Sequence, residues 1–222
     1  MGARSSQPEA PPPYLTDLGE RIGVIQTFAQ HDDQLILRLR EQKSSWSSKK
    51  FSVENAITGE QVFHVDSKKF SAQSRKIVQD AGRQPLFILK KTAYSIQVSY
   101  DGFDAKDQRL FSVTAAGGPF GQKQLYVRFK NNLGKGEWIQ IHIRGDWLNR
   151  NASVTLSDGT PIAHVSRLPL KVGEIVFDRQ TYYLMVAPGF DSALMVGATI
   201  CMNAARARKF DAGNSINFAF SG

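Results

Sequence analysis

The densest group of chemically useful side chains lies between residues 68 and 91 and is basic. Asp80 is the one acidic residue in this window, which carries a net charge of +6. Its basic residues are Lys68, Lys69, Arg75, Lys76, Arg83, Lys90 and Lys91. Ammonium and guanidinium groups donate charge-assisted hydrogen bonds, and such a field attracts phospholipid headgroups, nucleic acid or acidic proteins. The alternative is a solvated face with additional lysines.

Six of these residues are candidates for binding a lipid headgroup, because they lie at the ends of expected strands. They are Lys68, Lys69, Arg75, Lys76, Lys90 and Lys91. If residues 75–79 and 86–90 pair as a hairpin, the first basic pair comes close to the last. Near an acidic leaflet each basic residue contributes about 1 kcal/mol. Neighbours in a strand point to opposite faces, however, so half of the charges could point elsewhere.

The first six residues offer a second membrane signal. Met-Gly-Ala-Arg-Ser-Ser fits the N-myristoylation pattern, with Gly2 as the acceptor. One myristoyl chain binds bilayers with a constant of about 10⁴ M⁻¹, which is marginal alone and firmer beside a basic patch. The alternative is a chance match ahead of a flexible, Pro-rich leader.

The sequence indicates no catalytic or metal chemistry. It contains neither a Gly-x-Ser-x-Gly elbow nor a phosphate-binding Gly-x-x-x-x-Gly-Lys loop. The four histidines are scattered without metal-ligand spacing. Cys201 lies in an apolar run, where burial should raise its pKa and keep it inert. We therefore expect a non-enzymatic protein without cofactor or metal. Scrambling activity is the weakest hypothesis, since no Asp-x-Asp-x-Asp-Gly calcium loop is present.

Composition is that of a soluble globular protein. The chain has 222 residues, 41% of them hydrophobic and 22% charged, with a net charge of +8. A single cysteine and no apolar leader favour a reducing compartment. We expect a cytoplasmic monomer, with a peripheral membrane or nuclear location as alternatives. Direct DNA binding is not expected, because no DNA-binding motif is present and no exposed aromatic residues interleave the basic strand ends.

The elements that must position these residues are mostly strands. About a dozen strand-like segments are separated by turn signals. In residues 138–144, three isoleucines alternate with Trp138, Gln140, His142 and Arg144, which share the other face. Strands at this spacing favour a barrel or a sandwich. Residues 193–202 instead predict a helix that is apolar on every side and therefore buried, with Asp191 or Ser192 as its cap. Ten residues rise only about 15 Å, too short for a bilayer core of about 30 Å.

We therefore predict a barrel closed around this core helix. The helix residues expected to face the barrel wall are Ala193, Leu194, Met195, Val196 and Ile200. Residues 1–20, which contain three consecutive prolines, are expected to be a disordered tail, and residues 21–210 the barrel domain. Residues 211–222 would be a tail or a short last strand, because Ile216, Phe218 and Phe220 alternate.

Several sequence blocks resemble the LURP-one-related family, in the same order and spacing. They are Phe51-x-Val53-x-Asn55, Gly59-Glu60-x-Val62-Phe63-x-Val65-Asp66, residues 75–91 with their two basic pairs, Gly145-x-Trp147, and residues 186–196. The resemblance runs from about residue 35 to about residue 205. Residues 97–100 depart from it, since family members often carry a tryptophan there. Residues 117–121 and 131–136 look like insertions.

The resemblance implies a mainly β, tubby C-terminal-like fold: a closed antiparallel barrel of about twelve strands around a central hydrophobic C-terminal helix. The superfamily includes the tubby proteins, which bind phosphoinositides, and looks related to phospholipid scramblases. It therefore implies peripheral binding of anionic phospholipid or phosphoinositide membranes. The alternative is a protein-interaction or transcription-associated adaptor of the stress or defence type, with no lipid role and with partners bound through the Pro-rich tail.

Overall fold

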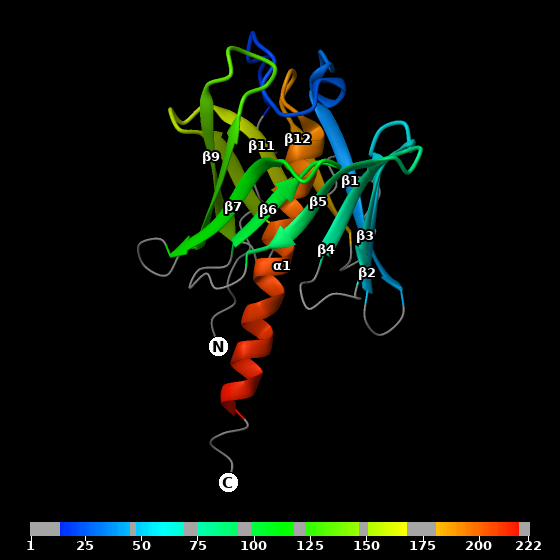
Figure 1. Ribbon diagram of the computed structural model, residues 1–222, viewed down its shortest axis with the longest axis vertical. Coiled ribbons are helices and arrows are strands. Elements are labelled where there is room, and N and C mark those ends of the chain that lie inside the picture. Colours follow the sequence, from blue (N-terminus) through cyan, green and yellow to red (C-terminus); the bar gives the residue numbers. More distant parts are fainter. Residues whose placement is uncertain are drawn as a thin grey trace, which may run out of the picture.

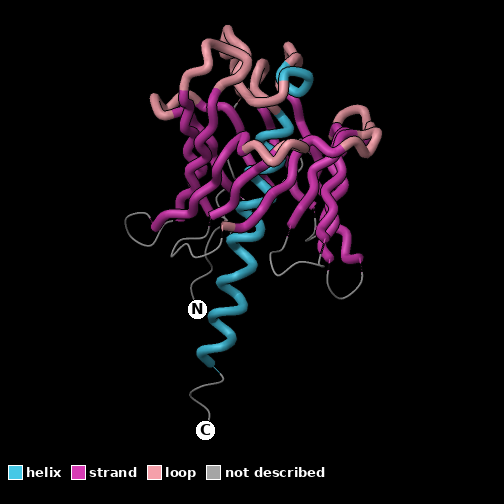
Figure 2. The backbone as a smooth tube through the Cα atoms, in the orientation of Figure 1, coloured by secondary structure: helices cyan, strands magenta, loops and turns pink. Residues whose placement is uncertain are grey.

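A computed structural model describes residues 14–44, 48–68, 75–92, 99–117, 123–146, 151–167 and 181–217. These residues form one short 3₁₀ helix, twelve strands and one α-helix (Figure 1, Figure 2). The elements are η1 (Gln26–Ala29), β1 (Leu35–Ser44), β2 (Ser48–Asn55), β3 (Gln61–Lys68), β4 (Arg75–Asp80), β5 (Pro85–Lys91), β6 (Ser99–Phe103), β7 (Arg109–Gly117), β8 (Lys123–Lys130), β9 (Trp138–Asp146), β10 (Asn151–Leu156), β11 (Pro161–Ser166), β12 (Thr181–Val186) and α1 (Ser192–Asn217).

The strands form a closed antiparallel barrel in which each strand pairs with its neighbours in sequence. β1 pairs with β12 and so removes the open edges that a sheet would otherwise expose. The alternation in β9 has the predicted meaning: Ile141 and Ile143 are buried, whereas Gln140 and Arg144 are exposed. The predicted twelve-stranded barrel is confirmed.

The α-helix lies along the inside of the barrel, and its second half projects from one end (Figure 1, Figure 2). Every residue from Ala193 to Met202 is buried. The single polar side chain in this run, Thr199, donates its hydroxyl to the Met195 carbonyl oxygen at 2.8 Å. The predicted core helix is therefore confirmed. No helix in the described ranges is both long and apolar enough to cross a membrane.

The helix continues farther than predicted, to Asn217. The prediction of a tail or strand is wrong for residues 211–217, while Phe218 and Phe220 lie outside the described residues. Propagating an existing helix is much less costly than starting one. The alanine- and arginine-rich run after Asn203 suits such propagation, so the alternation at Ile216 carried no strand signal.

Two glycines let the helix and the wall approach each other closely. A Cβ atom on Gly197 of the helix would lie 2.9 Å from the Phe87 ring and 3.2 Å from the Phe111 ring. A Cβ atom on Gly102 in β6 would lie 2.3 Å from the Phe111 ring. The two phenylalanine rings meet edge to face, with centroids 5.2 Å apart. The glycines thus leave the volume that this aromatic pair fills.

The packed part of the chain begins before residue 21. Leu15 is fully buried, and its backbone N–H donates to the Gln34 side-chain oxygen at 2.7 Å. It packs with Met185 and Ala187, which form a small second core apart from the main one. Placing residues 15–20 in the disordered tail is therefore wrong, because the Leu15 side chain packs against the barrel. Residues 1–13, including Gly2, lie outside the described residues.

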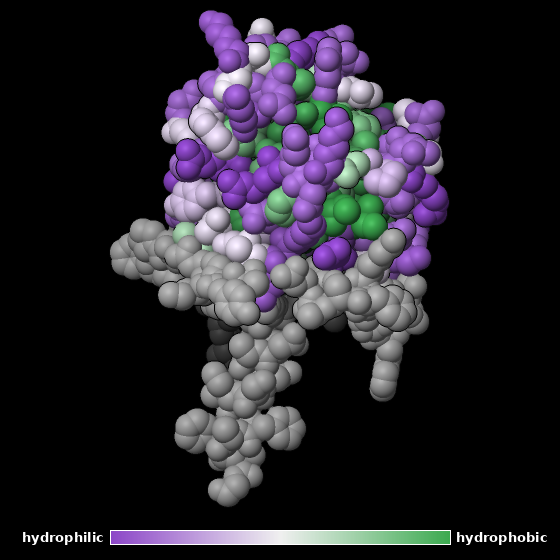
Figure 3. Space-filling view, in the orientation of Figure 1, coloured by the Kyte–Doolittle hydropathy of each residue, from purple (hydrophilic) through white to green (hydrophobic). Residues whose placement is uncertain are grey.

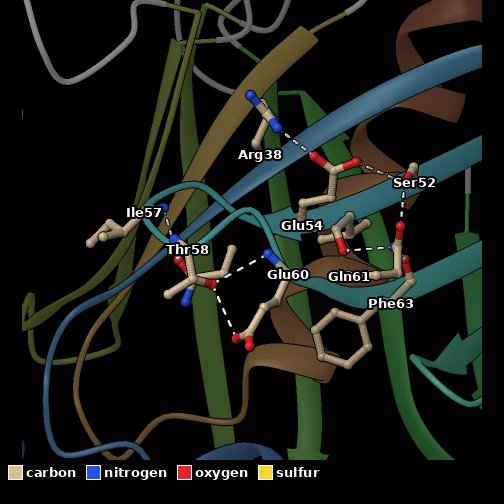
Figure 4. A network of polar contacts seen from close by, with 10 residues as sticks. Arg38, Ser52, Glu54, Ile57, Thr58, Glu60, Gln61 and Phe63 are labelled. Carbon is tan, nitrogen blue, oxygen red and sulfur yellow. Dashed lines mark hydrogen bonds and ion pairs between the residues drawn. The ribbon is translucent and has the colours of Figure 1, made fainter.

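A polar network fixes the register of the first three strands at a β-bulge between Val53 and Glu54 (Figure 4). Arg38 pairs with the Glu54 carboxylate at 2.5 Å. Ser52 donates to the Gln61 side-chain oxygen at 2.6 Å. The Gln61 amide in turn donates to the backbone carbonyl of Val53 at 2.9 Å. The bulge is thus held by side chains, which satisfy backbone groups that the ladder leaves open.

Candidate anion-binding surface

The direction of the strands decides where the basic residues meet. The helix enters the barrel beside Asp191 and leaves it after Ala205, at the end from which it projects (Figure 1). β12 runs toward Asp191 and β1 pairs antiparallel to it, so odd-numbered strands run toward the helix-exit end. The basic candidates therefore share the exit end. Lys68 ends β3, Arg75 and Lys76 begin β4, and Lys90 and Lys91 end β5. Lys69 lies outside the described residues.

Three of the candidates occupy one cross-strand row. Lys68 pairs with Arg75 across β3 and β4, and Arg75 pairs with Lys90 across β4 and β5. The predicted hairpin is therefore confirmed. Arg75 is exposed and Lys90 is partly exposed. Cross-strand neighbours have Cβ atoms about 5 Å apart, so these three positions lie next to one another on the barrel.

The other two candidates lie on the opposite face of the same strands. Lys76 pairs with the buried Leu89, and its ammonium lies 5.2 Å from the centroid of the Phe51 ring, a core side chain. Lys91 pairs with the buried Tyr100. Alternation thus splits each basic pair: Arg75 and Lys90 belong to the outer wall, while Lys76 and Lys91 belong to the inner rim.

Lys90 already has an acidic partner. Its ammonium forms an ion pair with the Asp107 carboxylate and lies 4.3 Å above the centroid of the Phe103 ring. The Lys90 side chain is 20% exposed, whereas that of Asp107 is 73% exposed. Because Asp107 lies in a turn seventeen residues farther along the chain, the pairing had no local signal in the sequence. Lys90 therefore attracts an anion less strongly than an unpaired lysine would.

The exit end gathers further basic residues that the window of residues 68–91 did not contain. Lys43, Lys49, Lys123 and Arg144 also lie at or near strand ends there, together with the acidic Asp146 that ends β9. The turns at the helix-entry end are acidic on balance. Arg83, Lys106 and Lys135 are outnumbered there by Asp32, Asp33, Glu60, Asp104, Asp107, Glu137 and Asp158. The barrel is thus electrostatically polarised along its axis. This polarity can be found in the sequence by comparing the charges where odd-numbered strands end and even-numbered strands begin with the charges at the opposite strand ends.

An apolar row lies beside the basic row on the outer wall. Ile77, Ile88 and Phe103 face one another across β4, β5 and β6. All three are half-buried, and they lie two positions along the strands from Arg75 and Lys90. Figure 3 shows hydrophobic residues among hydrophilic ones on this face of the barrel. Cations next to apolar side chains suit the boundary between headgroups and acyl chains.

Cys201 lies in the barrel interior and is fully buried. Burial raises the pKa of its thiol to about 12, although the nearby Lys76 charge opposes the shift. Within the described part of the chain, no cluster of three or more metal-ligating side chains occurs.

We expect Cys201 to be nearly inert in the folded protein, because only the thiolate reacts and it is scarcely populated below the raised pKa. A disulfide reagent at pH 8 should label the native thiol at least about 100-fold more slowly than the urea-unfolded thiol. Absorbance of the released thiolate reports both rates. Equal rates would place the thiol in solvent and contradict the burial of this part of the helix.

Comparison with known proteins agrees with the architecture. A family model described as LURP-one-related matches residues 35–203. An X-ray structure of a protein from Arabidopsis thaliana superposes with a TM-score of 0.58 at 14% identity, covering 83% of this chain and 98% of that chain. At this identity the likeness shows the fold alone. No curated protein matches the sequence.

Proposed function

The chain belongs to the LURP-one-related family, and from this premise we propose that it is a non-enzymatic, tubby-like protein that binds anionic membranes peripherally. The polarised barrel carries the proposal, since its helix-exit end is rich in basic residues and its entry end in acidic ones. The ligands are anionic phospholipids, phosphoinositides among them. The proposed setting is the cytoplasmic face of a membrane, reached by a monomer.

The expected strength follows from the number of cations that reach the surface. Arg75 is exposed on the outer wall, and Lys76 and Lys91 lie at the inner rim. Three or four such residues would contribute about 3–4 kcal/mol beside an acidic leaflet. This is a preference of about 100- to 1000-fold over neutral vesicles. Lys90 adds less while it is paired with Asp107.

Replacing Lys90 and Lys91 together with glutamate should lower binding to acidic vesicles by tenfold or more, because two attractions of about 1 kcal/mol each are removed. Folding should be retained, since neither side chain belongs to the buried core. Co-sedimentation with phosphatidylcholine vesicles, with and without phosphatidylserine or a phosphoinositide, measures the effect at low and high salt. Electrostatic adsorption weakens as salt rises.

The matched control is the double change Lys106→Glu and Lys135→Glu, which alters net charge equally in exposed turns at the entry end. It should bind nearly as the parent does. A second arm, Asp107→Asn, removes the acidic partner of Lys90 and should strengthen binding. If both double variants lose the same amount of binding to acidic vesicles, the effect comes from net charge alone and not from the exit end. If the parent protein binds neutral and acidic vesicles equally, or binds neither, the proposal is overturned and the adaptor role is favoured.

A further inference from the structure

The opposite part of the barrel wall is a second basic surface, formed by β7, β8, β9 and β10. Asp146 is the one acidic residue in these four strands. The basic residues at outward positions of these strands are Arg109, Arg128, Lys130 and Arg144. We call the outward side chains of these strands the β7–β10 wall. Of its basic residues, only Arg144 also belongs to the exit end on which the lipid proposal rests.

Aromatic side chains interleave the cations on this wall. Trp138 is 61% exposed, and the Arg128 guanidinium carbon lies 4.8 Å from the centroid of its ring. Tyr126, two positions from Arg128 on β8, pairs with His142, four positions from Trp138 on β9, and their rings meet edge to face with centroids 5.1 Å apart. Arg144 approaches the His142 ring from the next position, at 3.3 Å.

The spacing of these groups follows from the strand. Trp138 and His142 are four residues apart on β9, about 14 Å along it. Gln140 lies exposed between them, opposite Arg128. The wall thus presents two aromatic sites, the Trp138 ring and the Tyr126–His142 pair, with the Gln140 amide between them and basic side chains next to them. A planar group could stack on a ring at either site.

We infer that the β7–β10 wall binds single-stranded nucleic acid, RNA or DNA. Stacking of bases on aromatic rings combined with cations along the phosphate backbone is how sheet surfaces hold single strands. The sequence prediction against direct DNA binding rested on the lack of a DNA-binding motif and on the lack of exposed aromatic residues among the basic strand ends; the second ground does not hold for this wall. The pairing of β8 with β9 provides that interleaving, because each outward position of one strand faces an outward position of the other.

Other partner classes fit this wall less well. The centre of a protein interface is usually apolar, whereas the outward residues around the Tyr126–His142 pair are Ser112, Thr114, Gln140, Ser153 and Thr155. A membrane that contacts the basic exit end would lie far from Trp138, which begins β9 at the acidic entry end. Bases supply both flat faces for the rings and polar edges for these side chains.

Fluorescence anisotropy of labelled 12-nucleotide oligo(U) and oligo(dT) tests the inference with the full chain. We expect both to bind and to dissociate as salt rises. Trp138→Ala should weaken binding about tenfold, because one stacking contact is lost. Folding should survive, since the ring is mostly exposed. Arg83→Gln is the control, a 62% exposed cation outside the wall, and it should bind as the parent does.

The variants also separate the two surfaces. Trp138→Ala should bind acidic vesicles as well as the parent does, and Lys90→Glu with Lys91→Glu should retain stacking-dependent oligonucleotide binding. The inference is overturned if neither oligonucleotide binds, or if Trp138→Ala leaves binding unchanged. It also fails if the exit-end variant alone abolishes binding, since that would show polyanion adsorption at the lipid surface. Preference for one oligonucleotide would identify RNA or DNA as the ligand.

Discussion

Asp191→Ala is expected to lower the free energy of unfolding by about 3–6 kcal/mol, because the change removes a helix cap and leaves buried donors unpaired. The Asp191 carboxylate is fully buried. One oxygen accepts the N–H groups of Ala193 at 2.9 Å and Leu194 at 3.0 Å, in the first turn of α1. The other accepts those of Val24 at 3.0 Å and Ile25 at 2.7 Å.

This carboxylate therefore joins two distant parts of the chain. It caps the core helix and also anchors the segment before η1 to the entry end of the barrel. Burial raises the pKa of the Asp191 carboxyl, while its four backbone hydrogen bonds oppose that shift. A Cβ atom on Gly23 would lie 2.2 Å from the Asp191 Cβ. Glycine at position 23 thus lets the backbone lie directly against the Asp191 side chain.

Urea unfolding followed by circular dichroism measures the loss. Asp191→Asn keeps the shape but turns an N–H donor toward backbone donors, so it should also be strongly destabilising. Asp158→Ala is the control, since Asp158 also accepts a backbone N–H, from Thr160, but in an exposed turn. Its urea midpoint should move far less. Similar midpoints for Asp191→Ala and the control would contradict the anchoring role.

The fold was largely predictable because its main signals are local. Alternation over residues 138–144 gives a two-sided strand, and an unbroken apolar run after Ser192 can only be buried. The cap at Asp191 follows from the preference of its side chain for that position. Its second set of contacts does not, because Ile25 lies 166 residues away in the sequence. The local sequence does not show whether a capping residue also binds a segment that is distant in the sequence.

The candidate surfaces were predictable only in part, for the same reason. The basic pairs at residues 75–76 and 90–91 were found in the sequence. Which member of each pair faces outward depends on which alternate residues of the strand face the barrel core. The Asp107 partner of Lys90 and the stacking of Arg128 on Trp138 arise from turns and pairings between distant residues. The polarity of the barrel required the direction of every strand. These directions follow from the antiparallel order of all twelve strands, which no single segment shows.

Leu194→Asp should prevent folding. Leu194 is fully buried and belongs to the main core cluster, which has members from all twelve strands. The change removes a buried leucine, which costs about 2–5 kcal/mol, and adds a buried, unpaired carboxylate, which costs several kcal/mol more. The sum approaches the whole stability of an ordinary domain, about 5–15 kcal/mol. A closed barrel has no edge through which it could open to hydrate the charge.

Ile57→Asp is the matched control, since it makes the same kind of change at a side chain that is 74% exposed in a turn. It should fold and show the far-ultraviolet spectrum of the parent. Leu194→Asp should lose helix and sheet signals together, because α1 and the strands share one core cluster. If the sheet signal survived while the helix signal disappeared, the barrel would be stable alone. The barrel would then not need the helix for its stability, and its exit end could open when the helix leaves.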